Sequence, residues 1–381
     1  MADAEFRYVT TNLYQSGSTP NPIISELPLT GVNYTSQLNS VGTFQGHLLL
    51  SGAKASTYNA YEGTIPGKTI LWVLYSDPVS NTSIPVWSGV IWAREYDGAS
   101  QTLSINAQEM MSLYNRRRIS TTKDYDNTFY DPMYIAYQLM QYAEALPHGK
   151  TGLTYNTNSS AYATKKLYEG YELKSVYQAI KDLASNYFDF KISPLVSGGN
   201  LINRFYLGDP LGQTYSATDP YATVFQYPGN LVDYKFPEDA SSAANKLYGL
   251  GYGANNTKVI AIATDPSKIG TSGTWPLLED TANYIDVADN QLLKDLTLGQ
   301  LNAISYPPTT VEVVIPTYVD PIYPSYNIGQ QVRLDIKDDY FPSGLTGEVL
   351  RIVAISVAPG ENGPSRVTLT LTRLLAAGSV S

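Results

Sequence analysis

The stretch WSGVIWAREYDGASQTLSINA, residues 87–107, carries the clearest structural signal in the chain. Residues 87–93 form an apolar run, and residues 102–107 alternate polar and apolar side chains, which is typical of a half-buried strand. Asp97-Gly98 lies between the two runs, where a hairpin turn is expected. Residues 30–50 and 69–75 are also rich in β-type residues, so residues 1–118 are predicted to form a small barrel or sandwich.

Helical signals dominate the next part of the chain. Asp131-Pro132 pairs an N-cap residue with a proline at the first turn, and apolar residues then recur on one helix face. A second helix is predicted over Glu172–Asn186, followed by a strand at 188–192. Residues 119–243 are therefore predicted to form an α/β insert and a return segment.

The last third of the chain returns to strand patterns. The predicted strands lie at 246–252, 259–263, 311–315, 332–336, 349–357 and 367–372, and a helix is predicted near 289–301. The predicted fold class is mixed, β-rich α+β. It has two small β-barrel domains, 1–118 and 244–381, around the α/β insert, and the second barrel carries a short helical insertion.

Composition narrows the classes of function. Of the 381 residues, only 15% are charged, against a typical ~25%, and 32 are tyrosines. Tyrosine suits both β scaffolds and broad, partly wet interfaces, and these two interpretations are compatible. The net charge is −9, and the three predicted segments carry −1, −4 and −4. No segment is basic enough to bind nucleic acid by neutralising phosphates.

The chain contains no cysteine, so disulfides, thiolate metal sites and thiol catalysis are excluded. No apolar run approaches the ~18 residues that a membrane span needs, and the N-terminal residues do not resemble an export signal. We therefore expect synthesis in a bacterial cytoplasm and no membrane span.

Candidate catalytic residues are few and scattered. The two histidines, His47 and His148, lie in no metal-binding motif, and Gly249–Gly253 lacks the spacing of a dinucleotide loop. Asp124, Asp126 and Asp131 lack the glycine and distal glutamate of a calcium loop, and Asp338-Asp339 is typical of a turn. We predict no catalytic, cofactor-binding or metal-binding residue and no enzymatic activity.

Arg116, Arg117 and Arg118 form the one concentrated positive run. They could complete a solvated helix end, where cations complement the helix dipole. They could equally form an intersubunit contact with an acidic neighbour. Both interpretations stay open at this stage.

Three stretches resemble the hub proteins at the tail tip of long-tailed bacteriophages, a family also known as minor tail proteins. These stretches are residues 87–119, 244–251 and 328–371, which follow the layout of the family's barrel strands. The resemblance implies a homotrimer in which two related barrels per subunit make a pseudo-sixfold ring. Such a ring adapts a six-fold tail tube to a three-fold tip and encloses a channel that DNA crosses without sequence-specific binding.

The same resemblance implies a location at the virion tail tip. Its implied partners are tail-tube and distal tail proteins and other tail-tip or fibre proteins, and it implies no cofactor.

Two other functions compete with the hub. Aromatic rings could stack on sugars in a carbohydrate- or receptor-binding module: many of the tyrosines and the four tryptophans, Trp72, Trp87, Trp92 and Trp275, although Trp87 and Trp92 have opposite strand parity. Asp124 and Asp126 could serve an acidic-pair hydrolase.

Overall fold

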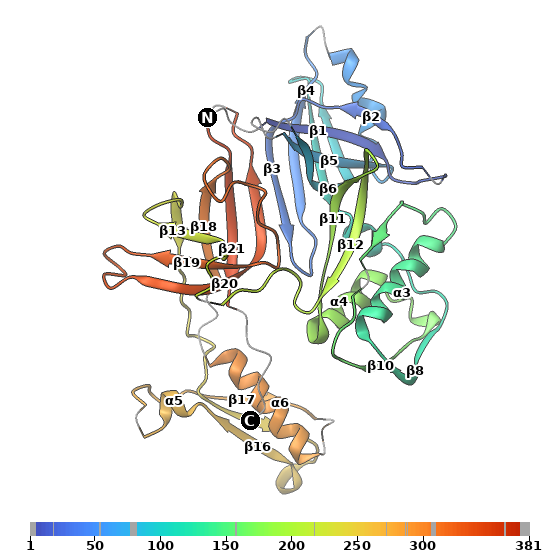
Figure 1. Cartoon of the computed structure of the whole chain (residues 1–381). Helices are drawn as coiled ribbons and strands as arrows, with labels where there is room; N and C mark the ends of the chain where they lie inside the picture. Colours follow the sequence, from blue (N-terminus) through green and yellow to red (C-terminus); the bar gives the residue numbers. More distant parts are fainter. Residues whose placement is uncertain are drawn as a thin grey trace. The chain divides into compact units, whose positions relative to one another are not determined.

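The computed structural model describes residues 5–17, 19–52, 55–76, 82–156, 158–216, 218–271, 273–285, 287, 289–305, 310–361 and 363–373. The chain divides into two compact units (Figure 1). Unit 1 comprises residues 1–233 and 313–370, and unit 2 comprises residues 234–312 and 371–381. This division does not test the three predicted domains, which stay a prediction.

Unit 1 begins with the strands of the predicted first β region. They are β1 (Glu5–Asn12), β2 (Ile23–Glu26), β3 (Thr30–Gln37), β4 (Thr43–Leu49), β5 (Thr69–Ser76), β6 (Ser83–Asp97) and β7 (Thr102–Glu109). Short helices join or follow them: η1 (Ala55–Tyr58), α1 (Ala60–Gly63) and α2 (Met111–Tyr114).

The hairpin predicted at Asp97-Gly98 is confirmed. β6 and β7 pair antiparallel, with Asp97 opposite Thr102. The Asp97 carboxylate accepts hydrogen bonds from the Ala99 N–H at 2.9 Å and from the Ser100 hydroxyl at 2.7 Å, so it shapes its own turn. Gln101, and not a glycine, takes the left-handed conformation with φ 51°.

The helical insert follows as predicted, with additional strands. Its elements are β8 (Lys123–Tyr130), α3 (Pro132–Ala145), β9 (Thr154–Tyr155), β10 (Thr164–Tyr168), η2 (Gly170–Glu172), α4 (Val176–Tyr187), β11 (Asp189–Ser197) and β12 (Asn200–Gly208). Asp131 caps α3 by accepting from the Met133 N–H at 2.8 Å. α4 begins later than predicted because Ser175 is its N-cap, accepting from the Gln178 N–H at 3.1 Å.

One hydrophobic core of unit 1 lies between the first strands and the insert. α3 and α4 pack on each other, and β11 lies along β6 (Figure 1). Fully buried side chains join these layers, among them Val9 and Val90 from the strands, Leu139 and Ile180 from the helices, and Phe205 from β12. The helical periodicity in the sequence therefore marked the buried faces of both helices.

Six further strands come before and after unit 2 in the sequence. They are β13 (Val224–Tyr227), β14 (Asp233–Lys235), β18 (Thr310–Pro316), β19 (Gln331–Ile336), β20 (Leu345–Ala358) and β21 (Arg366–Thr372). Their inward positions, such as Val313, Leu334 and Leu369, are fully buried. All four strands that were predicted between residues 311 and 372 are present.

The prediction of two small barrels is not confirmed, whereas the β-rich α+β class is. β20 is 14 residues long, so it pairs with β19 along one part and with β3 along another, where Tyr34 lies opposite Val357. The closing strands therefore continue the sheet of the first strands. Among the described strands, the main path of pairing runs openly as β14-β18-β21-β20-β3-β4-β7-β6-β5-β1-β2.

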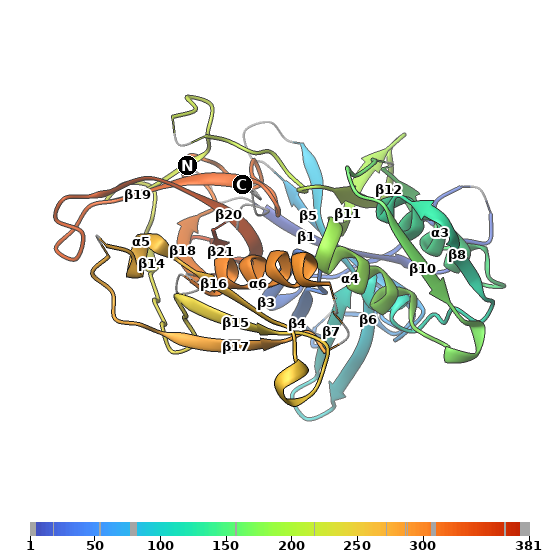
Figure 2. The same ribbon diagram turned by 90° about the horizontal axis from the view of Figure 1, so that it is seen from below.

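Unit 2 is a small α/β unit. It contains β15 (Lys246–Leu250), η3 (Asn255–Thr257), β16 (Ile260–Thr264), α5 (Pro266–Ile269), β17 (Glu279–Asn283) and α6 (Asn290–Ile304). The strands pair in the order β16-β15-β17, and α6 lies against this sheet (Figure 2). Asp289 caps α6 through the Leu292 N–H at 2.7 Å.

One buried ion pair ties distant parts of unit 1 together. The Arg351 guanidinium on β20 donates to the Asp189 carboxylate on β11 at 2.5 Å, and their side chains are 9% and 13% exposed. Arg351 also donates to the carbonyls of Gly329 at 2.9 Å and Leu211 at 2.7 Å. The Asn39 amide donates to Asp189 at 2.7 Å, so five separate segments meet at this pair.

We expect Arg351→Met to lower the free energy of unfolding of unit 1 by about 3–5 kcal/mol, because it leaves the Asp189 carboxylate buried without its partner. Urea unfolding followed by tryptophan fluorescence measures this loss. A Trp275→Phe background confines the fluorescence to Trp72, Trp87 and Trp92, which all lie in unit 1.

Arg333→Met is the matched control on the neighbouring strand β19. The Arg333–Asp335 pair is longer, at 3.3 Å, and more exposed. Its loss is expected to cost less than about 1 kcal/mol. Equal small losses in both variants would show that the Arg351 pair does not hold unit 1 together.

Candidate functional site

The predicted catalytic candidates lie apart in the fold. His47 lies in β4, where its Nδ1 is 3.0 Å from the Ser104 hydroxyl, and His148 lies in a turn with φ 57°, its ring 5.1 Å from that of Tyr14. Across the described residues, no group of three or more His, Cys, Asp or Glu side chains could hold a metal ion.

The acidic and glycine-rich candidates have structural roles. Asp131 caps α3 and also accepts from Ser160, and the Asp124 carboxylate accepts from the Asp126 N–H at 2.8 Å. Gly249 lies in β15, where a Cβ atom would come within 1.9 Å of the Thr297 hydroxyl on α6. The glycine there permits close packing of helix and strand, which supports the structural interpretation of the Gly249–Gly253 run.

The three arginines separate into one internal and two exposed side chains. The Arg117 guanidinium pairs with Glu144 at 2.8 Å, with both side chains 12% exposed, and donates to the Gly149 carbonyl. Arg116 is exposed and lies 5.5 Å from the Trp92 ring centre, and Arg118 is exposed as well. The predicted intersubunit contact stays a prediction, and Arg116 and Arg118 are its exposed members.

The tryptophans are mostly internal. Trp72 and Trp87 are buried, and their indole N–H groups donate to the Thr11 hydroxyl and the Thr35 carbonyl. Trp92 is half-buried and donates to Ser112, so the opposite parity of Trp87 and Trp92 does place one ring deeper. Trp275 is 44% exposed, with Lys268 4.7 Å from its ring centre. Trp275 alone of the four tryptophans is exposed, so the tryptophans do not form a row of exposed rings for stacking on sugars.

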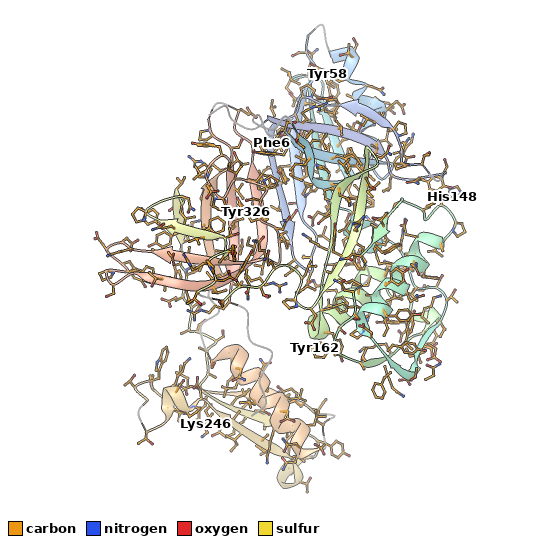
Figure 3. All side chains as sticks on the ribbon, viewed as in Figure 1. Phe6, Tyr58, His148, Tyr162, Lys246 and Tyr326 are labelled. Carbon is orange, nitrogen blue, oxygen red and sulfur yellow. The ribbon has the colours of Figure 1, made fainter. Side chains whose placement is uncertain are left out.

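A tyrosine cluster joins the first strands of unit 1 to the Thr317–Gln330 segment. The hydroxyl oxygens of Tyr34 and Tyr323 are 3.2 Å apart, and the Tyr323 ring packs edge-on against Tyr75 and Tyr326. Figure 3 shows Tyr326 beside the last strands of the chain, and it is only 1% exposed, so it is fully buried. The sequence pattern gave no indication of this cluster, because residues such as Tyr34 and Tyr323 are 289 positions apart.

A cavity of about 230 Å³ adjoins the cluster within unit 1. Strands β3, β6 and β11 line it together with residues 323–328. Its two ionisable residues other than tyrosine are Glu109 and Lys191. Burial raises the pKa of Glu109 to about 7, and burial lowers the pKa of Lys191 to about 8, partly offset by the charge of Glu109.

Exposed apolar side chains concentrate on both layers of unit 2. On β16, Ala261 and Ala263 face α6, whereas Ile260 and Ile262 face away and are 54% and 59% exposed. On α6, the side chains outside the sheet contact include Leu292, Leu296 and Leu298, with exposures of 50%, 38% and 37%. An apolar face of this kind on a small sheet marks an interaction surface.

No model of a known protein family matches the chain, and no curated protein matches it. Solved structures do share its fold, which is that of phage tail proteins. A tail protein from Neisseria meningitidis is similar over 96% of both chains, with 11% identity and a TM-score of 0.58. The 43 kDa tail protein of prophage MuSo2 from Shewanella oneidensis is 12% identical over 96% of this chain and 98% of its own, with a TM-score of 0.60.

A third structure, a PdpA–VgrG complex from Francisella, is 10% identical with a TM-score of 0.61. The similarity covers 98% of this chain and 53% of that one. These likenesses confirm, at the level of the fold, the resemblance to tail-tip hub proteins. Among the described residues, no helix is long and apolar enough to cross a membrane.

Glu109 gives a prediction about pH. Its folded pKa lies above the ordinary value of 4.5, so folded chains hold a proton that unfolded chains lose between about pH 4.5 and 7. Stability is therefore expected to fall as pH rises through this window, by about 2 kcal/mol between pH 5.5 and 7.5.

Glu109→Gln cannot ionise and should remove this part of the pH dependence, as measured by urea unfolding at both pH values. Glu95→Gln, at an exposed position of β6, is the control and should keep the wild-type slope. An unchanged slope in Glu109→Gln would assign the dependence to other groups.

Proposed function

We propose that this protein is a structural component of a phage tail tip, where it forms a homotrimeric hub at the distal end of the tail tube. The observation that carries the proposal is the similarity of fold over 96% of this chain to two phage tail proteins of nearly the same extent. The two β regions of unit 1 would supply two related segments per subunit. Three subunits would then build a pseudo-sixfold ring that continues a six-fold tube.

The charge of the chain supports a passive channel. A net charge of −9, with no basic segment, gives DNA little phosphate-neutralising surface to adhere to. DNA would therefore cross the proposed ring without sequence-specific binding. The proposed partners are tail-tube and distal tail proteins and other tail-tip or fibre proteins, and the proposed location is the virion tail tip.

The exposed apolar faces of unit 2 supply candidate contacts for this assembly. A three-stranded sheet that presents isoleucines away from its helix leaves apolar area that another chain would cover. A polar group borders these isoleucines. The Glu279 carboxylate pairs with the Lys246 ammonium at 2.8 Å and accepts a hydrogen bond from the Tyr248 hydroxyl at 2.7 Å. An apolar patch with an ordered polar border is typical of protein interfaces.

Negative-stain electron microscopy of the purified chain tests the hub directly. We expect a particle with three-fold symmetry and a central hole, and light scattering should give about three times the mass of one chain. A monomer that also fails to bind tail-tube protein would contradict the proposal.

The double variant Ile260→Lys/Ile262→Lys is expected to fold and to lose assembly, because it places two ammonium groups on the proposed contact. Light scattering should show that the trimer dissociates to monomers. The dissociation constant of the trimer should be at least tenfold higher than that of the parent chain. Glu95→Lys makes the same +2 change in charge at an exposed position of β6 in unit 1, so it is the control and should assemble normally. An intact trimer in the double variant would place the subunit contact elsewhere.

A further inference from the structure

The cavity beside the tyrosine cluster is lined by two donor groups that have no acceptor among the described residues, the Lys191 ammonium and the Tyr326 hydroxyl. The Lys191 ammonium makes no hydrogen bond and no ion pair within 4.0 Å among the described residues, and its nearest ring contact is Tyr206 at 5.9 Å. Tyr326 is 1% exposed, and its hydroxyl has no hydrogen-bond partner. Tyr34 and Tyr323 share a single hydroxyl–hydroxyl bond, so one of their two protons is left over.

The one carboxyl group in the cavity is already engaged elsewhere. Glu109 Oε2 accepts from the Gly42 N–H at 2.7 Å, and the Ser36 hydroxyl also donates to this carboxyl. Glu109 therefore does not satisfy the Lys191 ammonium directly. Because burial raises the pKa of Glu109 to about 7, its carboxyl also carries only part of a negative charge at neutral pH.

The buried Tyr326 hydroxyl costs free energy while it lacks an acceptor, and the half-buried Lys191 ammonium has no anionic partner among the described residues, so a ligand that brings acceptors and negative charge would be stabilised here. The other walls are largely apolar and include Ile84, Pro85, Ile192, Ile328 and Ile355. We propose that this cavity binds a carboxylate on a short apolar stem, with the Lys191 ammonium and the Tyr326 hydroxyl donating to the carboxylate. The site is independent of the proposed tail role.

Two sources share this chemistry: a free short-chain carboxylic acid, and a glutamate side chain of another protein. Butyrate and the capped tripeptide acetyl-Ala-Glu-Ala-amide are the corresponding probes for the full chain. Saturation-transfer NMR and thermal unfolding in sodium butyrate, against sodium chloride of equal ionic strength, measure binding. Butyrate binding supports a free acid, and binding of the peptide alone supports a glutamate side chain.

Lys191→Met and Tyr326→Phe test the assigned donors. Lys191→Met removes a half-buried ammonium and Tyr326→Phe removes a buried hydroxyl. Neither group has a partner in the described part of the chain and both changes keep the shape of the side chain, so both variants are expected to fold at least as well as the parent. The dissociation constant should rise at least tenfold in Lys191→Met and several-fold in Tyr326→Phe. Lys165→Met removes an exposed lysine of β10 and should bind as the parent does.

Each result decides the proposal. Unchanged affinity in Lys191→Met and Tyr326→Phe would move any observed binding to another site and overturn it. If neither probe binds, the proposal is also overturned. Ordered water would then satisfy the donors that line the cavity.

Discussion

The buried pair of Arg351 and Asp189 is the contact on which the arrangement of unit 1 depends most. Its partners come from β11, from β20 and from two loops, and the paired residues are 162 positions apart. The loops approach so closely that a Cβ on Gly212 would lie 2.4 Å from the Gly329 carbonyl carbon, and both glycines have positive φ, so glycine is required at both positions. A buried charge with several hydrogen bonds fixes geometry more than it adds stability, and here it fixes the meeting of the insert with the closing strands.

The continuity of the sheet follows from the same constraint. Asp189 opens β11 beside Asn39, and Asn39 forms the turn between β3 and β4, so anchoring Asp189 also holds strand β3 in place. β20 carries Arg351 and then pairs with β3 a few residues later. The two β regions are therefore parts of one sheet pathway within a single chain. In the proposed ring, such a subunit would behave as a rigid double segment, which suits a junction between different symmetries.

Local patterns in the sequence predicted the elements that depend on neighbouring residues. Asp131-Pro132 gave the start of α3, Asp97-Gly98 gave the hairpin, and the alternation in 367–372 gave β21. Strand β8 was missed because its side chains are mostly exposed, so it lacks an apolar period. Long-range contacts could not be predicted from the sequence, for a different reason. The Arg117–Glu144 pair and the cavity around Lys191 join residues whose sequence separation carries no periodic signal.

The abundance of tyrosine has two explanations, and the structure uses both. Tyr34, Tyr114 and Tyr326 are fully buried, and two of these three hydroxyls have partners, so tyrosine fills the core while it joins distant segments. Tyr171 and Tyr221 are 81% and 84% exposed and add nothing to that core. A folded chain gains no stability from exposed aromatic rings, whereas an interface gains contact area at low cost in side-chain entropy. The exposed tyrosines therefore favour the proposed assembly, in which the apolar faces of unit 2 would also be covered.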